Sequence, residues 1–185
     1  MDSRPTLSPL KGASDPRSPT VYLAGPDVFY QDAEERGKVM CALCAEQGFE
    51  GLYPLNAPLD PGIQPQSRAI FEANKAMLER ADAVVANLRD WRGPEPDSGT
   101  VWEVAYALAL GKPVIAYLPN SHSLRQRMNQ TAPDGIDPEG HAVEDFGLPL
   151  NLMLAHSLTG VAYGSEDRYE GLSAALVMLR RQFRM

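Results

Sequence analysis

The sequence predicts an α/β protein with a flavodoxin-like fold: a doubly wound, parallel five-stranded sheet in a three-layer sandwich. Two observations predict this class. Short apolar runs alternate with helical segments along most of the chain, and this order places helices on both faces of a parallel sheet. The chain has 185 residues, of which 44% are hydrophobic and 22% charged, as expected of one domain with one large core.

The expected strands are short and apolar, and turn residues bound most of them. The first, residues 20–24, is rich in β-branched and apolar side chains and stops at Gly25 and Pro26. Residues 49–53 follow Gly48 and form the second. The clearest buried run is 81–88, in which apolar residues surround one aspartate and one asparagine. The last two expected strands are residues 113–117 and 161–163.

The expected helices carry apolar residues three and four positions apart, which indicates one buried face. Gly48 and Gly111 follow two of them, as glycine often follows the end of a helix. The expected helices span residues 33–47, 67–80, 100–110, 148–158 and 169–183. Loops are expected over residues 54–65, 89–99 and 120–146, the last with a short helix.

Residues 1–18 are expected to form a flexible tail ahead of a single domain over residues 19–185. The tail is polar and rich in proline and has no apolar stretch of the kind found in secretory signals, so we expect a cytoplasmic protein. No run approaches the roughly 18 apolar residues that cross a membrane, so no membrane partner is expected. The formal net charge of −7 repels phosphate backbones, which argues against a nucleic-acid polymer as partner.

Common cofactor and metal motifs do not occur in the sequence. It contains no phosphate-binding GxxxxGK[ST], no GxGxxG after the first strand and no GxSxG. Cys41 and Cys44 stand three residues apart inside an expected helix, and we interpret them as small core residues, because zinc would need two more ligands. The histidines show no ligand spacing: they are His122, His141 and His156.

Two carboxylates, Asp97 and Glu103, flank the start of the helix expected at residue 100. If Thr100 is the N-cap, Glu103 lies in the first helical turn, where the helix dipole favours its ionised form. Such a carboxylate at the carboxyl edge of a sheet can attack the anomeric carbon of a nucleoside. Thr100 and Glu103 also match a capping box, in which the glutamate bonds its own main chain, and both interpretations remain open at this point.

Four segments in register resemble the nucleoside 2-deoxyribosyltransferase family. They are residues 22–26 (Tyr-Leu-Ala-Gly-Pro) with Phe29, residues 81–88, the stretch from Asp97 to Glu103 with its Ala-Tyr-Ala and Gly-Lys-Pro continuation, and residues 151–153 (Asn-Leu-Met). The resemblance covers about residues 20–158. It implies ping-pong transfer of 2-deoxyribose between nucleobases, a role in nucleoside salvage, and no metal or cofactor.

The resemblance also implies roles for individual residues. Glu103 matches the nucleophile, and Tyr22 matches the tyrosine that orients it. Asp97 matches the carboxylate that holds the sugar 5′-hydroxyl, and Phe29 matches an aromatic that packs against the base. Asn151 and Met153 match a segment beside the active site, whose asparagine comes from a neighbouring subunit. The expected partners are therefore a nucleoside, a free nucleobase and further copies of the chain, in a dimer or larger homo-oligomer with shared active sites.

One departure concerns the proton for the leaving base. Relatives often carry an aspartate where this chain has Asn74, and an amide cannot donate a catalytic proton at neutral pH. Either another group or solvent supplies that proton, or Asn74 only recognises the base; a polar residue on an exposed helix face is the alternative. Asp27 is a candidate substitute acid near the first turn, and Asn56, in the long loop expected over residues 54–65, is a candidate contact to the base.

Asp97 predicts a nucleoside as substrate, because a carboxylate repels a 5′-phosphate and accepts a hydrogen bond from a 5′-hydroxyl. Related monophosphate hydrolases carry serines where this chain has Asp97 and Pro26. Two other functions remain open: an N-glycoside hydrolase, for nucleosides or nucleotides, that uses the same glutamate with water, and a non-catalytic nucleoside- or nucleotide-binding module on the same fold.

Overall fold

The computed structural model describes residues 17–183, so the tail expected over residues 1–18 lies almost wholly outside the described residues. Five parallel strands form one sheet in the order β2-β1-β3-β4-β5. They are β1 (Thr20–Ala24), β2 (Glu50–Leu52), β3 (Ala83–Asn87), β4 (Val114–Leu118) and β5 (Gly160–Tyr163). This order confirms the expected doubly wound sheet, with its switch in strand order between β1 and β3.

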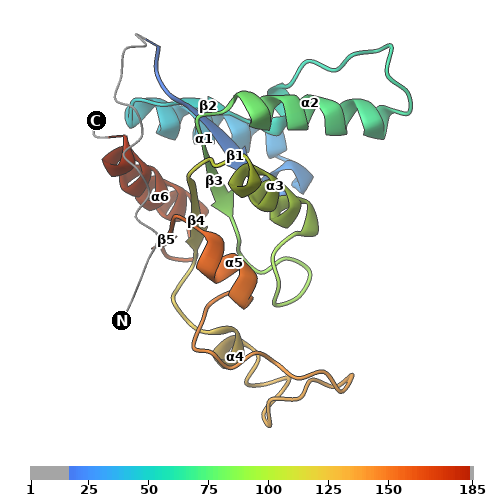
Figure 1. Ribbon diagram of the computed structural model, residues 1–185, viewed down its shortest axis with the longest axis vertical. Coiled ribbons are helices and arrows are strands. Elements are labelled where there is room, and N and C mark those ends of the chain that lie inside the picture. Colours follow the sequence, from blue (N-terminus) through green and yellow to red (C-terminus); the bar gives the residue numbers. More distant parts are fainter. Residues whose placement is uncertain (1–16, 184–185) are drawn as a thin grey trace.

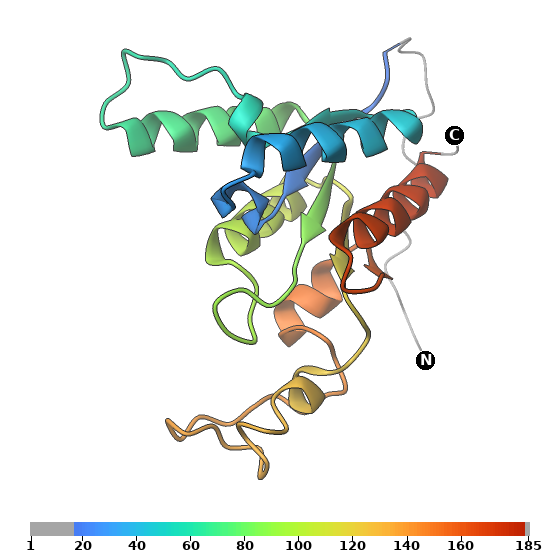
Figure 2. The same ribbon diagram turned by 180° about the vertical axis from the view of Figure 1, so that it is seen from behind.

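Helices cover both faces of the sheet (Figures 1 and 2). One face carries α1 (Ala33–Glu46) and α6 (Arg168–Gln182), and the other carries α2 (Gln66–Arg80), α3 (Ser98–Ala109) and α5 (Leu152–Ser157). Two short 3₁₀ helices, η1 (Pro26–Phe29) and η2 (Pro54–Asn56), follow β1 and β2. The segment between β4 and α5 contains α4 (Leu124–Arg127) and extends away from the sheet in both views.

The two-residue period of β1 divides its side chains between the two helical layers. Val21 and Leu23 pack in the core under α1 and α6, whereas Tyr22 and Ala24 pack in the core under α2 and α3. All four side chains are fully buried. The alternation therefore carries the Tyr22 phenol into the α2–α3 layer, where the site described below is found.

The two cysteines belong to the packing of α1 against the sheet. Cys44 is fully buried in the core, and the half-buried Cys41 packs against the same cluster and lies 3.4 Å from the carbonyl oxygen of Gly51. Burial raises the pKa of the Cys44 thiol to about 12 and also raises that of Cys41, so neither favours the reactive thiolate. This placement confirms that they are core residues.

Some boundaries differ from the expectation. The helix expected over 148–158 begins only at Leu152, because Asn151 is its N-cap and accepts a hydrogen bond from the Met153 backbone N–H at 3.0 Å. Across residues 17–183, no helix combines the length and the apolar character that a membrane span requires.

Candidate active site

A cavity of about 340 Å³ lies between α2 and α3. Its walls come from one side of each helix, and an aromatic residue stands on each wall. The lining residues are Phe71, Asn74, Lys75, Leu78, Gly99, Trp102 and Glu103. The cavity falls within the roughly 300–1,000 Å³ of typical small-molecule sites, which are largely apolar with a few polar groups.

Glu103 is held in this cavity by one hydrogen bond from the sheet. The Tyr22 hydroxyl donates to Glu103 Oε1 at 2.6 Å, across 81 positions in the sequence. Burial and the adjoining carboxylate raise the pKa of Tyr22 far above its usual range, so the phenol stays protonated and keeps donating. Within residues 17–183 no other hydrogen bond to this carboxylate is found, so its second oxygen remains for a ligand.

The expectation that the helix dipole would favour the ionised form of Glu103 is wrong. The pKa of Glu103 is raised to about 7: burial raises it most, the Tyr22 hydrogen bond lowers it, and the nearby charge of Asp97 raises it further. Desolvation outweighs the other effects because the side chain lies between two helices and the sheet. The result is a carboxyl group poised to gain or lose its proton near neutral pH.

The expected N-cap is also wrong, and this removes the capping-box interpretation. α3 begins at Ser98, and Asp97 is its N-cap: the Asp97 Oδ2 atom accepts hydrogen bonds from the Thr100 backbone N–H at 2.9 Å and from the Thr100 hydroxyl at 3.0 Å. Aspartate is among the strongest N-cap residues, so it draws Ser98 and Gly99 into the helix. Glu103 therefore lies in the second turn and bonds Tyr22 rather than the start of its own helix.

The cavity also places Asn74 together with Glu103. Sequence reasoning did not select the two aromatic residues that flank them, Phe71 and Trp102, whose ring centroids lie 5.3 Å apart. Their signal was available in the helical spacing, because Phe71, Asn74 and Leu78 recur on one side of α2. A helix pattern does not distinguish a core face from the wall of a cavity, and only the packing of α2 against α3 does so.

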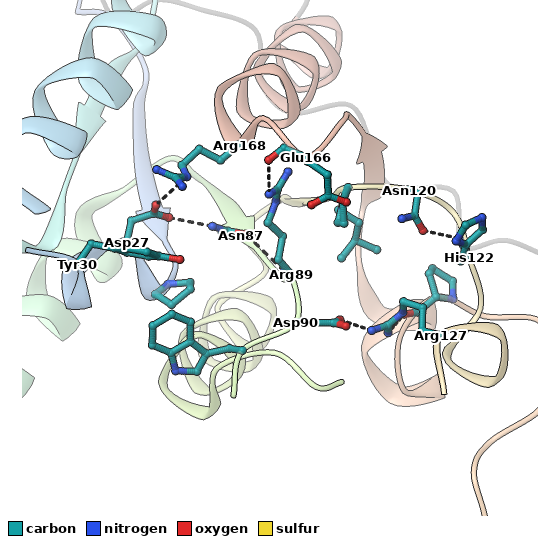
Figure 3. Close-up of a pocket in the computed structure, with 15 residues that line it drawn as sticks. Asp27, Tyr30, Asn87, Arg89, Asp90, Asn120, His122, Arg127, Glu166 and Arg168 are labelled. Carbon is teal, nitrogen blue, oxygen red and sulfur yellow. Dashed lines mark hydrogen bonds and ion pairs between the residues drawn. The ribbon is translucent and has the colours of Figure 1, made fainter. Parts of the chain in front are cut away.

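A second cavity of about 280 Å³ lies at the carboxyl edge of the sheet, where β1, β3 and β4 end (Figure 3). Charged and amide side chains converge there from the strand ends and from the start of α6. The charged lining residues are Asp27, Arg89, Asp90, Arg127, Glu166 and Arg168. Arg89 donates to the carbonyl oxygens of Ser165 and Glu166, and Arg127 pairs with Asp90.

Asp27 lines this second cavity rather than the one that holds Glu103. Its side chain is 2% exposed; Asn87 Nδ2 donates to its Oδ2 atom at 2.8 Å, and Arg36 donates to its Oδ1 atom at 3.4 Å. Arg168 Nε stands 4.0 Å from the same oxygen. Gly25 permits this approach, because a Cβ there would lie 2.8 Å from the Cβ of Asn87.

The other sequence-predicted site residues lie outside the lining of both cavities: Tyr22 and Asp97, described above, and Phe29, Asn56, Asn151 and Met153. Phe29 is 58% exposed and stacks on Trp91, with ring centroids 5.7 Å apart. Asn151 Nδ2 donates to Glu144 Oε1 at 2.7 Å, and Met153 is 72% exposed on the first turn of α5. Asn56, in η2, is exposed.

The fold is that of flavodoxin-like α/β proteins, with the partly buried carboxylate of Glu103 lining a cavity between α2 and α3. A family model described as nucleoside 2-deoxyribosyltransferase matches residues 21–153. The chain therefore belongs to this family, as the resemblance of its motifs predicted. The description of the family names transfer of 2-deoxyribose from a nucleoside.

Solved structures agree with this assignment. A 2-desoxiribosyltransferase from Leishmania mexicana is 29% identical, with a TM-score of 0.67 over 88% of this chain and 97% of that one. A conserved protein from Enterococcus faecalis is 22% identical, with a TM-score of 0.54 over 83% of this chain and 96% of that one, and shows the same fold.

Two curated proteins are also similar. An uncharacterized protein of Schizosaccharomyces pombe is 28% identical over 130 residues, which are 65% of this chain. The match covers 61% of that relative, so the chain spans less than two thirds of its length. A Thermofilum pendens protein, provisionally named a 2′-deoxynucleoside 5′-phosphate N-hydrolase, is 32% identical over 116 residues, which are 60% of this chain and 73% of that protein.

Proposed function

We propose that the protein transfers 2-deoxyribose between nucleobases through a covalent deoxyribosyl ester on Glu103. The observation that carries the proposal is the environment of that carboxylate. Tyr22 holds Oε1 at 2.6 Å, the second oxygen has no partner among residues 17–183, and both belong to a side chain that lines an aromatic cavity. A glutamate fixed by one donor and open on its other side has the form of an oriented nucleophile.

The proposed reaction has two displacements at the same carbon. A Glu103 oxygen forms a bond to C1′, the C1′–N bond breaks, and the nucleobase leaves with the electron pair and acquires a proton. A second base then attacks C1′, loses a proton and displaces the carboxylate. Tyr22 orients the glutamate and stabilises its charged form, because its hydroxyl donates to that form.

A hydrolase that uses the same ester is the second candidate, because the Thermofilum pendens relative is named for N-hydrolysis. In that case water, rather than a second base, attacks C1′. The two functions differ only in which molecule reaches the ester first, and this depends on how well the closed site excludes water. Release of free deoxyribose in the presence of an acceptor base would favour the hydrolase.

We further propose a free 5′-hydroxyl on the substrate. The N-cap bonds use Oδ2 of Asp97, so Oδ1 is left to accept from the sugar. A 5′-phosphate would place like charges together beside Glu103, whose pKa the charge of Asp97 already raises. A wild-type protein that cleaves deoxynucleoside monophosphates as well as deoxynucleosides would contradict this part of the proposal.

Asn151 and Met153 are proposed to act on a neighbouring copy of the chain. They stand at the start of α5, where Met153 is exposed, and neither lines the Glu103 cavity of its own chain. A homo-oligomer would bring such an exposed turn to a partner's site. Equilibrium sedimentation reports the oligomeric state, and activity recovered on mixing Glu103→Gln with Asn151→Ala subunits would support a shared site.

The direct experiment is incubation with a deoxynucleoside, with and without a second base, followed by chromatography of bases and nucleosides. We expect a new nucleoside only when the second base is present, and an intact-mass increase of one deoxyribosyl group. Glu103→Gln should lower turnover by about a thousandfold or more, because an amide is a poor nucleophile.

Glu34→Gln is the matched control, because it makes the same change at an exposed position of α1 on the opposite face. It should retain wild-type turnover. Glu103→Gln with wild-type turnover would refute the covalent mechanism, whereas a wild type without turnover would leave the non-catalytic binding module as the better interpretation.

A further inference from the structure

Two charged side chains line the α2–α3 cavity: Glu103 on α3 and Lys75 on α2. Lys75 follows Asn74 directly and lies one helical turn from Phe71, on the same side of α2. If Glu103 reacts at C1′, the base attached to that carbon extends into the remainder of the cavity. Asn74 and Lys75 are the polar groups on the opposite wall that can meet its edge.

Neighbouring residues keep Lys75 cationic. Its Nζ atom lies 3.0 Å from Glu79 Oε1 and 5.7 Å from the centroid of the Tyr106 ring. Tyr106 in turn donates to Glu79 at 2.5 Å, which fixes the carboxylate. The bond to Glu79 raises the pKa of Lys75, so the side chain is an ammonium group at all working pH values. An ammonium has three donor hydrogens and no acceptor, and Glu79 uses one of them.

Three aromatic rings lie next to one another along the cavity and beside Lys75. Trp102 stacks on Tyr106, with centroids 5.1 Å apart and planes 15° apart, and the Phe71 ring lies tilted against Trp102 at 5.3 Å between centroids. Phe71 and Trp102 are 38% and 43% exposed, although both are large and apolar. A nucleobase that enters the cavity gains stacking contacts with these rings, since every base presents an aromatic face.

We propose that Lys75 selects nucleobases that carry a carbonyl oxygen, rather than an amino group, at position 6 of a purine or position 4 of a pyrimidine. The inference rests on the proposed function, since it takes the cavity beside Glu103 as the base subsite. A carbonyl oxygen accepts from the ammonium, whereas an amino group would set donor against donor. The Asn74 amide both donates and accepts, so it does not discriminate.

The test compares deoxyinosine, which has a carbonyl oxygen at position 6 of its base, with deoxyadenosine, which has an amino group there. We expect the wild-type kcat/KM for base release to favour deoxyinosine by about tenfold or more, the effect of a hydrogen bond to a charged group. Lys75→Met, which keeps an unbranched side chain but lacks the terminal ammonium, should bring the ratio close to one. Lys38→Met is the control at an exposed position of α1 and should keep the wild-type ratio.

Binding is measured in parallel, so that the inference does not depend on turnover. Calorimetry with free hypoxanthine and free adenine uses the Glu103→Gln variant, with and without Lys75→Met. A preference for hypoxanthine that disappears with Lys75→Met supports the inference even if no nucleoside is cleaved. The absence of cleavage would refute only the proposed function.

Equal binding of hypoxanthine and adenine, together with equal cleavage of deoxyinosine and deoxyadenosine, would overturn the inference and leave the proposed function standing. A preference that survives Lys75→Met would overturn it too, as would a failure of both bases to bind. Thermal unfolding of each variant shows whether it is folded. Lys75→Arg, which remains a donor without an acceptor, should keep the preference.

Discussion

Asp27 is buried and Glu103 is partly buried, and the two carboxylates have opposite surroundings. Asp27, in the cavity at the sheet edge, has Asn87 and Arg168 beside it (Figure 3), and Arg36 donates to it as well. Glu103, in the α2–α3 cavity, has one hydrogen-bond donor among residues 17–183, the Tyr22 phenol, and Asn74 and Lys75 line the same cavity without bonding to it. Asp27 is enclosed by partners, whereas Glu103 is left with an open oxygen.

The comparison separates a structural carboxylate from a reactive one. A carboxylate whose oxygens already accept hydrogen bonds from the protein has few lone pairs free for a substrate. Removing its charge leaves partner groups buried without that counter-charge. A carboxylate that burial leaves under-solvated gains stabilisation when it reacts or is protonated. Its raised pKa is therefore consistent with chemistry at Glu103 and not with a scaffold role.

The largest expected effect on stability comes from Asp27→Asn. The change removes the negative charge that faces Arg36 and Arg168, and the almost fully buried Arg36 then keeps, among residues 17–183, only its ion pair with the exposed Asp32. We expect the free energy of unfolding to fall by about 3–5 kcal/mol, as for other broken buried pairs. Urea unfolding measures this loss, with Asp134→Asn as the exposed control.

Base release by the folded Asp27→Asn protein should stay near the wild-type rate. The sequence made Asp27 a candidate proton donor to the leaving base, and a large loss of turnover in folded protein would restore that role. Such a result would remove the distinction between the two carboxylates.

Glu103→Gln should have the next largest effect on the free energy of unfolding, and it should raise this free energy rather than lower it. The pKa of Glu103 is about 7 in the folded protein, against an ordinary value of 4.5 for a glutamate in water, so folding makes the side chain hold its proton more tightly. The stability of the wild type therefore falls as pH rises from about 4.5 to 7. We expect Glu103→Gln to match the wild type near pH 4 and to exceed it by about 2–3 kcal/mol at pH 8.

Urea unfolding at both pH values tests this expectation, with Glu34→Gln as the control. A variant that is less stable than the wild type at pH 8 would show that the charge of Glu103 supports the fold. Glu103 would then be a structural carboxylate like Asp27, and the contrast between the two would not hold.

Tyr22→Phe should have the smallest effect of the three substitutions, and this effect is on the pH dependence of activity rather than on stability. It removes the hydroxyl that lowers the pKa of Glu103, so the pH at which activity rises should move upward by about one to two units. The activity loss should be large at pH 6 and small at pH 9. The pH profile of kcat/KM measures the shift, with Tyr163→Phe on the exposed end of β5 as the control. A profile that falls uniformly at all pH values would mean that Tyr22 does not act through the ionisation of Glu103.

Much of the fold could be read from local patterns. The alternation of buried strands and amphipathic helices follows from side-chain periodicity alone, and the glycines at 48 and 111 adopt the positive φ angles of helix ends, 84° and 72°. The side of β1 on which Tyr22 lies is also decided by sequence, because successive strand residues point to opposite faces. The pairing of Tyr22 with Glu103 followed from the resemblance of the motifs to a known family.

Boundaries and charge states were decided by the tertiary structure. Residues 97–100 offer two competing caps, and the Asp97 carboxylate, which bonds two Thr100 groups, prevails over the Thr100 hydroxyl. The sequence could place Glu103 near a helix start, where a dipole argument lowers its pKa. Its actual pKa depends on how much water α2, α3 and the sheet exclude, and that is a property of packing between distant segments.

The sequence by itself therefore determined the layers of this protein and the type of residue offered for chemistry. Only the tertiary structure decided which of these residues share a cavity: Asn74 and Lys75 with Glu103, and Asp27 with the arginines at the sheet edge. The physical reason is that periodicity reports which face of an element is apolar. It does not report which neighbouring face that element meets or how completely the two faces close.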